Sequence, residues 1–271
     1  MTLPDALRIL WHHHTNHPRK RWFFKPTGAP PSEEVDEACN LLAISPPEEV
    51  IPDLAGIIWN AEASLREKLG SIFMTLASRM PAGSWPLADS DIRTSHRFHQ
   101  NPSRDFPDEE MQICPALIII GLCHPSGRTR EKAISSSKHL VPSLSAPLLM
   151  IRVNDWVTPI RKTTASQLAN CLKALGAEEK MTLVPLLARV RQGGRHEGTL
   201  QFDQWEKILG TPFDEPVWLR SWAKAKGRQR RDYFGILKTS GHAPGVSLRR
   251  SLLSSNDRMI LVWPSVNSCR P

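Results

Sequence analysis

Residues 154–161 read Asn-Asp-Trp-Val-Thr-Pro-Ile-Arg, and this stretch indicates the fold. A turn residue, Asp155, comes directly before a segment that opens a helix, and Arg161 follows it by six positions. Ala165 and Leu168 continue the pattern at helical spacing, which places small and apolar side chains on one stripe. The stretch therefore predicts a turn that leads into an amphipathic helix.

The same arrangement occurs 31 residues earlier in the chain. His124 stands where Asp155 stands, and Arg130 stands where Arg161 stands. A fainter copy opens at Asp257 near the end of the chain. Self-similarity at a fixed spacing of a few tens of residues is typical of stacked structural repeats.

A turn with Asp, then Pro or Val, then Ile-Arg at the start of a helix resembles the HEAT repeat, most clearly over residues 117–191. The spacing of 31 residues is shorter than the usual HEAT period of about 40. The resemblance implies an all-α fold, an α-solenoid of antiparallel helix pairs that bury one another's apolar faces. It also implies structural roles for Asp155, Arg161, Arg130 and Asp257, because the turn Asp and the helix Arg commonly pair along such a stack.

The composition agrees with an all-α protein. Apolar residues make up 40% of the chain and charged residues 23%, and nine Trp and eight Phe accompany one Tyr without the alternation expected of strands. The longest apolar stretch, residues 115–123, is about half of what a membrane span needs. Five cysteines without a C-x-x-C pair favour reduced thiols over disulfides or zinc. We therefore expect a cytoplasmic protein with no cofactor and no membrane contact.

Hydrophobic periodicity and turn residues predict helices along most of the chain. The clearest is 61–79, with Asn60 as its cap, and the leucines of 157–175 are expected to pack against those of 178–191. Helix starts are expected at Ser32 and at Ser45, and the other predicted helices lie near 4–11, 91–99, 108–123, 127–140, 144–153, 199–209, 214–226 and 228–239.

The chain divides into an N-terminal arm or cap, residues 1–31, and a repeat domain, residues 32–271. Four prolines make residues 81–107 irregular, and a break between two repeat blocks is expected there. The copy that opens at Asp257 is broken by Pro264, so the last repeat looks incomplete. An uncovered apolar end promotes association, so self-association through this end is expected.

The net charge of +8 is concentrated in one segment, residues 220–250, which holds nine basic residues and one acidic residue. Basic residues interleaved with Trp222 and Tyr233 suit phosphate contacts with base stacking. The same run also suits a solvated helix end or contact with an acidic protein surface. The candidate binding residues are Arg220, Lys224, Lys226, Arg228, Arg230, Arg231, Arg249 and Arg250.

The sequence gives weaker support for an enzymatic function. The histidine tract at 12–17 lacks ligand spacing for a metal, and Cys123 and His124 are chain neighbours rather than a catalytic pair. Asp155 beside Trp156 resembles the DNA-alkylation-repeat glycosylases, but the turn already accounts for that Asp. The sequence thus favours a non-enzymatic scaffold that binds another protein, with nucleic-acid binding through residues 220–250 as the alternative and such a glycosylase as a second alternative.

Overall fold

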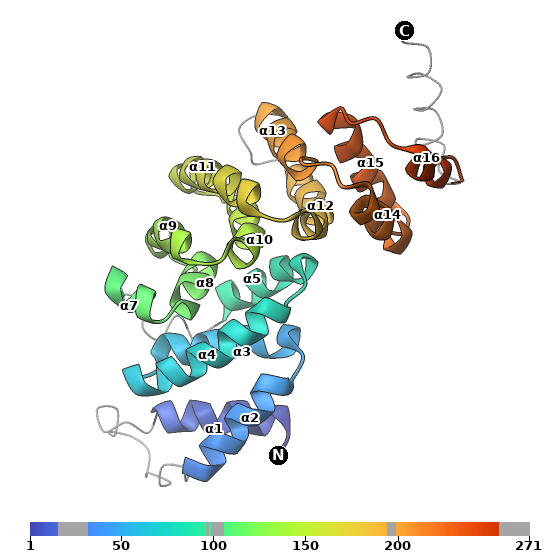
Figure 1. Cartoon of the computed structure of the whole chain (residues 1–271). Helices are drawn as coiled ribbons and strands as arrows, with labels where there is room; N and C mark the ends of the chain where they lie inside the picture. The colour runs from blue at the N-terminus through green and yellow to red at the C-terminus, as the bar shows by residue number, and fades with distance from the viewer. Residues whose placement is uncertain (16–31, 96–97, 99–105, 194–198, 255–271) are drawn as a thin grey trace.

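Helices form all the regular structure in the part of the chain that the computed structural model describes, residues 1–15, 32–95, 98, 106–193 and 199–254 (Figure 1). No strand occurs in these residues, so the all-α prediction is confirmed. None of the described helices is both long and apolar enough to span a bilayer.

Apart from residues 16–31 and 95–107, short connections join the elements, and most of these hold Pro, Gly, Asn or Asp. In chain order they are α1 (Leu3–Thr15), α2 (Ser32–Ile44), α3 (Pro47–Asn60), α4 (Ala63–Arg79), η2 (Ala82–Ser84), α5 (Trp85–Thr94), α7 (Asp108–Ile113), α8 (Ala116–Cys123), α9 (Gly127–Ser136), η3 (Ser137–His139), α10 (Pro142–Arg152), α11 (Thr158–Ala174), α12 (Ala177–Gln192), α13 (Thr199–Leu209), α14 (Glu215–Lys224), α15 (Arg228–Ser240) and α16 (Val246–Leu253).

From α8 onward the helices pack in two rows. In one row α9, α11, α13 and α15 contact one another in turn, and in the other α8, α10, α12, α14 and α16 do so. Across the rows, α8 pairs with α9 and α10 pairs with α11. Figure 1 shows the molecule extended from α1 and α2 at one end to α14 and α16 at the other.

The core runs continuously between the helices, with α8 near its middle. Every residue of α8 is buried, and a helix that is apolar all round must be covered on all sides. It contacts α3, α4 and α5 as well as α9 and α10. Gly121 permits the close approach of α9, because a Cβ there would lie 2.8 Å from Cβ of Ala133.

Several predicted helix bounds were wrong. The helix expected over 108–123 is two helices, α7 and α8, because Pro115 interrupts the backbone hydrogen bonds between them. The helix expected near 91–99 runs from Trp85 to Thr94, since Pro86 occupies its first turn, where proline is tolerated. Asn60 ends α3 instead of capping α4, and its amide donates to the Gly56 carbonyl at 2.9 Å.

The expected helix pairing was also wrong. The helix after Asp155, α11, packs chiefly against α10, which precedes it, and not against α12. The turns at His124 and Asp155 therefore join the two helices of a packed pair, α8 with α9 and α10 with α11. The leucines of α11 and α12 are buried as predicted, but the two helices pack mainly against other helices and not against each other.

The proposed break at 81–107 falls in a region that contains η2 and α5. There α5 contacts α3, α8 and α10, and η2 contacts α12. The division into an arm and a repeat domain stays a prediction. Asp257 and the incomplete last repeat lie outside the described residues, as do residues 16–31 of the arm.

Candidate functional site

The basic segment predicted from the sequence forms α14, α15 and α16. Asp214 starts α14 by accepting a hydrogen bond from the Val217 amide at 3.0 Å. One face of α14 is apolar and packs inward, while Arg220 and Lys224, four residues apart, are exposed on another. Amphipathic spacing thus presents these two cations at the surface.

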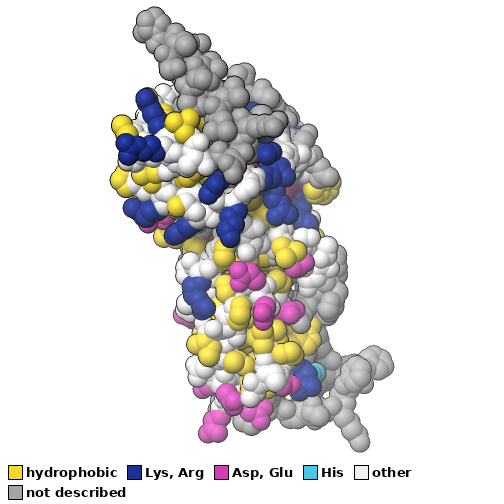
Figure 2. Space-filling model, turned by 90° about the vertical axis from the view of Figure 1, so that its right-hand side faces the viewer, with side chains coloured by type: hydrophobic (Ala, Val, Ile, Leu, Met, Phe, Trp, Pro, Cys, Tyr) yellow, Lys and Arg dark blue, Asp and Glu magenta, His cyan; other side chains and the backbone are white. Residues whose placement is uncertain are grey.

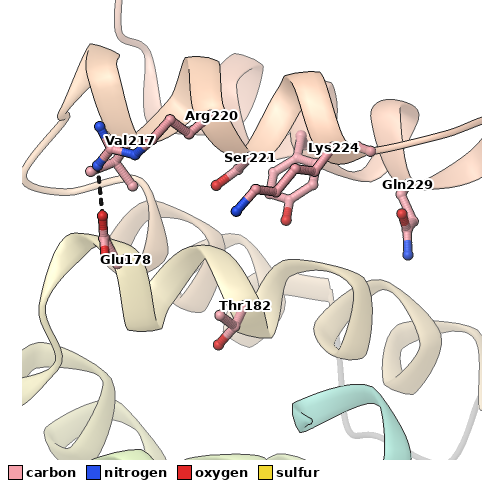
Figure 3. Close-up of a pocket in the computed structure, with 9 residues that line it drawn as sticks. Glu178, Thr182, Val217, Arg220, Ser221, Lys224 and Gln229 are labelled. Carbon is pink, nitrogen blue, oxygen red and sulfur yellow. Dashed lines mark hydrogen bonds and ion pairs between the residues drawn. The ribbon is translucent and has the colours of Figure 1, made fainter.

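A groove of about 280 Å³ lies where α14 and α15 meet α12 (Figure 3). Arg220, Ser221 and Lys224 point from α14 toward α12. Polar side chains from α12 and α15 complete the lining. The residues around it are Glu178, Thr182, Val217, Arg220, Ser221, Lys224, Ala225, Gln229 and Tyr233.

The groove has one acid among its lining residues, and that acid is paired. Arg220 donates to Glu178 at 2.6 Å, with both side chains more than half exposed. Tyr233 is buried and donates to the Met181 carbonyl at 3.0 Å, which ties α15 to α12. Burial raises the pKa of Tyr233, so its hydroxyl stays neutral near pH 7. The arrangement offers cations and neutral hydrogen-bonding groups to an acidic ligand.

The structure does not bring the other predicted cations into this groove. Arg230 donates to the Ala225 carbonyl at 3.0 Å and lies over the Trp222 ring. Arg231 lines a second hollow of about 190 Å³ among α12, α13 and α15. Arg249 donates to the Pro244 carbonyl at 2.8 Å. The remaining candidates, all exposed, are Lys226, Arg228 and Arg250.

The aromatic residues of the basic segment are packed inside. Trp218, Trp222 and Tyr233 are 2%, 4% and 7% exposed. Base stacking needs an accessible aromatic face. The described surface of α14 and α15 therefore presents cations without the stacking platform that the interleaved sequence suggested.

The turn residue Asp155 is buried in a network of charges. Its carboxylate accepts two hydrogen bonds from Arg130, at 2.9 and 3.0 Å, and one from Arg152 at 3.2 Å. Arg152 also pairs with Asp89 of α5, which accepts from Arg93 as well. This network joins α5, α9, α10 and the turn before α11.

The two sequence copies make the same local bonds. Arg130 donates to the carbonyl of His124, and Arg161 donates to the carbonyl of Asp155, each at 2.8 Å. The ring of His124 and the carboxylate of Asp155 each accept from the amide two residues ahead, at 3.0 Å. An ion pair joins Arg130 of the first copy to Asp155 of the second, whereas Arg161 donates to the Asp155 carbonyl and the Thr158 hydroxyl.

These contacts make Asp155 unsuited to act as a catalytic residue. Both its oxygens are occupied by donors, its side chain is inaccessible, and Trp156 points outward with 64% exposure. Burial raises the pKa of the Cys123 thiol, which lies beside Asp89, well above its ordinary value, so a thiolate is not formed near pH 7. Among the described residues no group of His, Cys, Asp and Glu is placed to hold a metal ion.

No known family model, curated protein or solved structure matches the chain. The groove's lining from α12, Glu178 and Thr182, was missed by sequence reasoning because these residues lie about 40 positions from Arg220. Of these two residues, only Glu178 had a feature visible in the sequence, because it is an acidic residue in the first turn of a helix.

Proposed function

We propose that the chain is a non-enzymatic scaffold, a HEAT-like α-solenoid, that binds an acidic segment of a partner protein in the groove between α12 and α14. The repeated turn supports the solenoid interpretation, since His124 and Asp155 occupy equivalent positions with equivalent bonds. A solenoid exposes an extended surface to partners, and its charged end is a natural contact site.

The observation that carries the proposal is the pair of exposed cations, Arg220 and Lys224, on one wall of an open groove. One carboxylate of an extended peptide pairs with Lys224, and a second competes with Glu178 for Arg220. Thr182, Ser221 and Gln229 supply hydrogen bonds for the peptide backbone. A peptide needs no stacking surface, so the burial of Trp218 and Trp222 favours a protein partner over a single-stranded nucleic acid.

Selection of phage-displayed random peptides on the immobilised protein tests this function. Peptides rich in Asp and Glu are expected to be enriched, and to lose at least about tenfold in affinity on Lys224→Glu, because a like charge then faces them. Lys238→Glu, at the far end of α15, is the matched control and should bind as the parent does. Peptides that bind Lys224→Glu and the parent equally would show that the groove is not the binding site.

A second variant reports on the same groove in the opposite direction. Glu178→Gln removes the carboxylate that now pairs with Arg220, leaving this cation for the peptide. An exposed ion pair contributes little, about 1 kcal/mol or less. We therefore expect the affinity for the selected acidic peptides to rise by a few-fold, and unchanged or weaker binding would argue against a role for Arg220.

A further inference from the structure

Charge is separated along the chain. Residues 32–113 hold fifteen acidic and six basic residues, whereas residues 114–254 hold twenty-two basic and ten acidic residues. The first segment contains α2 to α5 and α7, and the second contains α8 to α16. Each part thus carries a large charge of one sign, although the whole chain carries only +8.

The fold keeps these charges apart. In Figure 1 the acidic helices α2 and α3 lie toward one end and the basic helices α14 and α16 lie at the other. Figure 2 shows Asp and Glu side chains over the lower part of one face and Lys and Arg side chains over the upper part. Exposed charges separated by more than about 8 Å are largely screened at physiological ionic strength, so the two ends do not neutralise each other within one molecule.

The acidic end is the exposed carboxylates of α2 and the start of α3. Within the chain, Asp36 pairs with Lys68, and Glu48 accepts from the Ser84 hydroxyl at 3.4 Å. Beside them Ile44, at the end of α2, is 75% exposed. The exposed acids of this end are Glu33, Glu34, Asp36, Glu37, Glu48 and Glu49.

The basic end is formed by Arg220 and Lys224 of α14 with Arg249 and Arg250 of α16. All four residues are exposed, and α14 contacts α16. This end also exposes apolar side chains, because Val246 and Leu253 of α16 are 68% and 53% exposed. Apolar groups surrounded by charged groups are the usual composition of a protein interface.

We infer that two copies of the chain bind head to tail, the acidic end of one on the basic end of the next. The inference rests on the proposed function, because it uses the same groove and names a second copy as a partner. Such a contact is heterologous and leaves one acidic and one basic end free, so further copies can add. Its strength must fall with salt, since exposed charges hold it.

Two charge-reversed variants test the inference. Glu33→Lys, Glu34→Lys, Glu37→Lys, Glu48→Lys and Glu49→Lys together reverse the charge of the acidic end, and Arg220→Glu, Lys224→Glu and Arg249→Glu together reverse that of the basic end. Lys138→Glu, Lys162→Glu and Lys173→Glu, all on exposed residues of η3 and α11, make a control with the same change of charge as the second variant. Circular dichroism establishes that each variant retains its helices.

Sedimentation at several salt concentrations supplies the readout. The parent and the control are expected to exceed twice the monomer mass of 30.5 kDa at low salt and to return to it at high salt. Each end variant alone should stay monomeric, because its two ends then carry like charges. An equimolar mixture of the two should associate again, since each acidic end then meets a basic one.

A parent that stays monomeric at low salt would overturn the inference, as would a mixture of the two variants that fails to associate. The proposed function can survive that result. If acidic peptides still bind the parent and lose affinity on Lys224→Glu, the groove binds an acidic segment and only the second copy is the wrong partner.

Discussion

At the scale of single residues, Asp155 shows how a residue in a turn between two helices becomes a buried structural contact. Its carboxylate accepts from Arg130, Arg152 and the Val157 amide, and its carbonyl accepts from Arg161. A buried carboxylate is tolerable only when such donors replace water. The Asp in the turn therefore fixes the start of α11 and binds it to α9 and α10.

Asp155→Ala is expected to destabilise the fold far more than Arg161→Ala. Without Asp155 the guanidinium groups of Arg130 and Arg152 stay buried with a partner lost, which costs on the order of 3–5 kcal/mol. Arg161 is half-buried and donates to two uncharged oxygens, the backbone carbonyl of Asp155 and the Thr158 hydroxyl. Its loss should therefore lower the free energy of unfolding by about 1 kcal/mol. Urea unfolding measures both.

Asp155→Asn serves as the control, because it keeps the shape and one acceptor oxygen while removing the charge. Its free energy of unfolding should fall between those of the Ala variant and the parent. Equal losses for Asp155→Ala and Arg161→Ala would show that the buried ion pair is not what stabilises this turn.

Asp89 predicts a distinct pH dependence. Burial raises its pKa from 3.8 to about 6, although Arg93 acts to lower it. Between these values the folded chain holds a proton on Asp89 that the unfolded chain releases, so the free energy of unfolding falls as pH rises. The fall is at most about 3 kcal/mol, at roughly 1.4 kcal/mol for each pKa unit.

Asp89→Asn removes this titration, so the variant isolates it from the other acids. The free energy of unfolding of the parent minus that of the variant should decrease between about pH 4 and pH 6 and stay constant above. Chemical denaturation at a series of pH values measures it. A constant difference across this range would mean that Asp89 titrates normally.

Residue patterns identified Asp155 and Arg130 but not the whole network. The turn and its Arg recur at a fixed spacing, so a single sequence reveals them. Asp89 lies 63 positions before Arg152 and meets it only because α5 packs against α10. Contacts of that kind depend on how helices stack, which local periodicity does not encode.

At the scale of helices, α16 is the element that sequence reasoning missed. Its eight residues, Val-Ser-Leu-Arg-Arg-Ser-Leu-Leu, are too few for helical periodicity to stand out in the sequence. Leu248 and Leu252 nevertheless bury it against its neighbours. The Glu215 side chain fixes its start, accepting from the amides of Gly245 at 3.0 Å and Leu248 at 3.2 Å.

Removing this cap should release α16 locally. Glu215→Ala leaves the first amides of α16 without their acceptor, at a cost of about 1 kcal/mol typical of lost caps. Gly245→Ala should act alike, because a Cβ there would lie 2.0 Å from the Glu215 carboxylate. Hydrogen exchange of residues 246–253 is expected to speed up in both variants, while α9 and α11 exchange as in the parent.

Glu215→Gln is the matched control, since its amide oxygen retains one acceptor. It should show a smaller increase in exchange than Glu215→Ala. Exchange in α16 that none of the three substitutions alters would show that Leu248 and Leu252 hold the helix without the cap.

The helix pairs illustrate where prediction stops at this scale. Leucine spacing correctly marked the buried faces of α11 and α12, but it could not say which neighbour covers each face. An apolar stripe is compatible with any partner of the same shape. We expected α11 to pair with the helix that follows it, α12, whereas it packs chiefly against the helix that precedes it, α10.

At the scale of the whole molecule, the packing of the helices determines which of the nine basic residues in residues 220–250 lie on the same surface. The sequence placed them in one segment, but α14, α15 and α16 turn them in different directions. Arg220 and Lys224 line the groove beside α12, whereas Arg231 lines the hollow beside α13. A linear run of charge is thus not a continuous surface, and only the packing shows this.

This arrangement predicts weak, salt-sensitive binding of nucleic acid. If only two or three cations meet phosphates at once, the logarithm of the affinity for duplex DNA should fall against the logarithm of the salt concentration with a slope of about −2 to −3. Without accessible aromatic faces, single strands should bind no better than duplex. Fluorescence anisotropy with labelled DNA and RNA at several salt concentrations measures these slopes.

Two variants separate this weak binding from the proposed function. Arg228→Gln, Arg230→Gln and Arg231→Gln together should flatten the slope by roughly one unit for each lost contact. They should leave the groove-selected acidic peptides bound as in the parent, because none of the three lines the groove. Lys224→Glu should weaken peptide binding at least about tenfold and change the DNA slope by about one unit at most. A slope near −5 with tight binding at physiological salt, lost in the triple variant, would instead make nucleic acid the partner and residues 228–231 its contact surface.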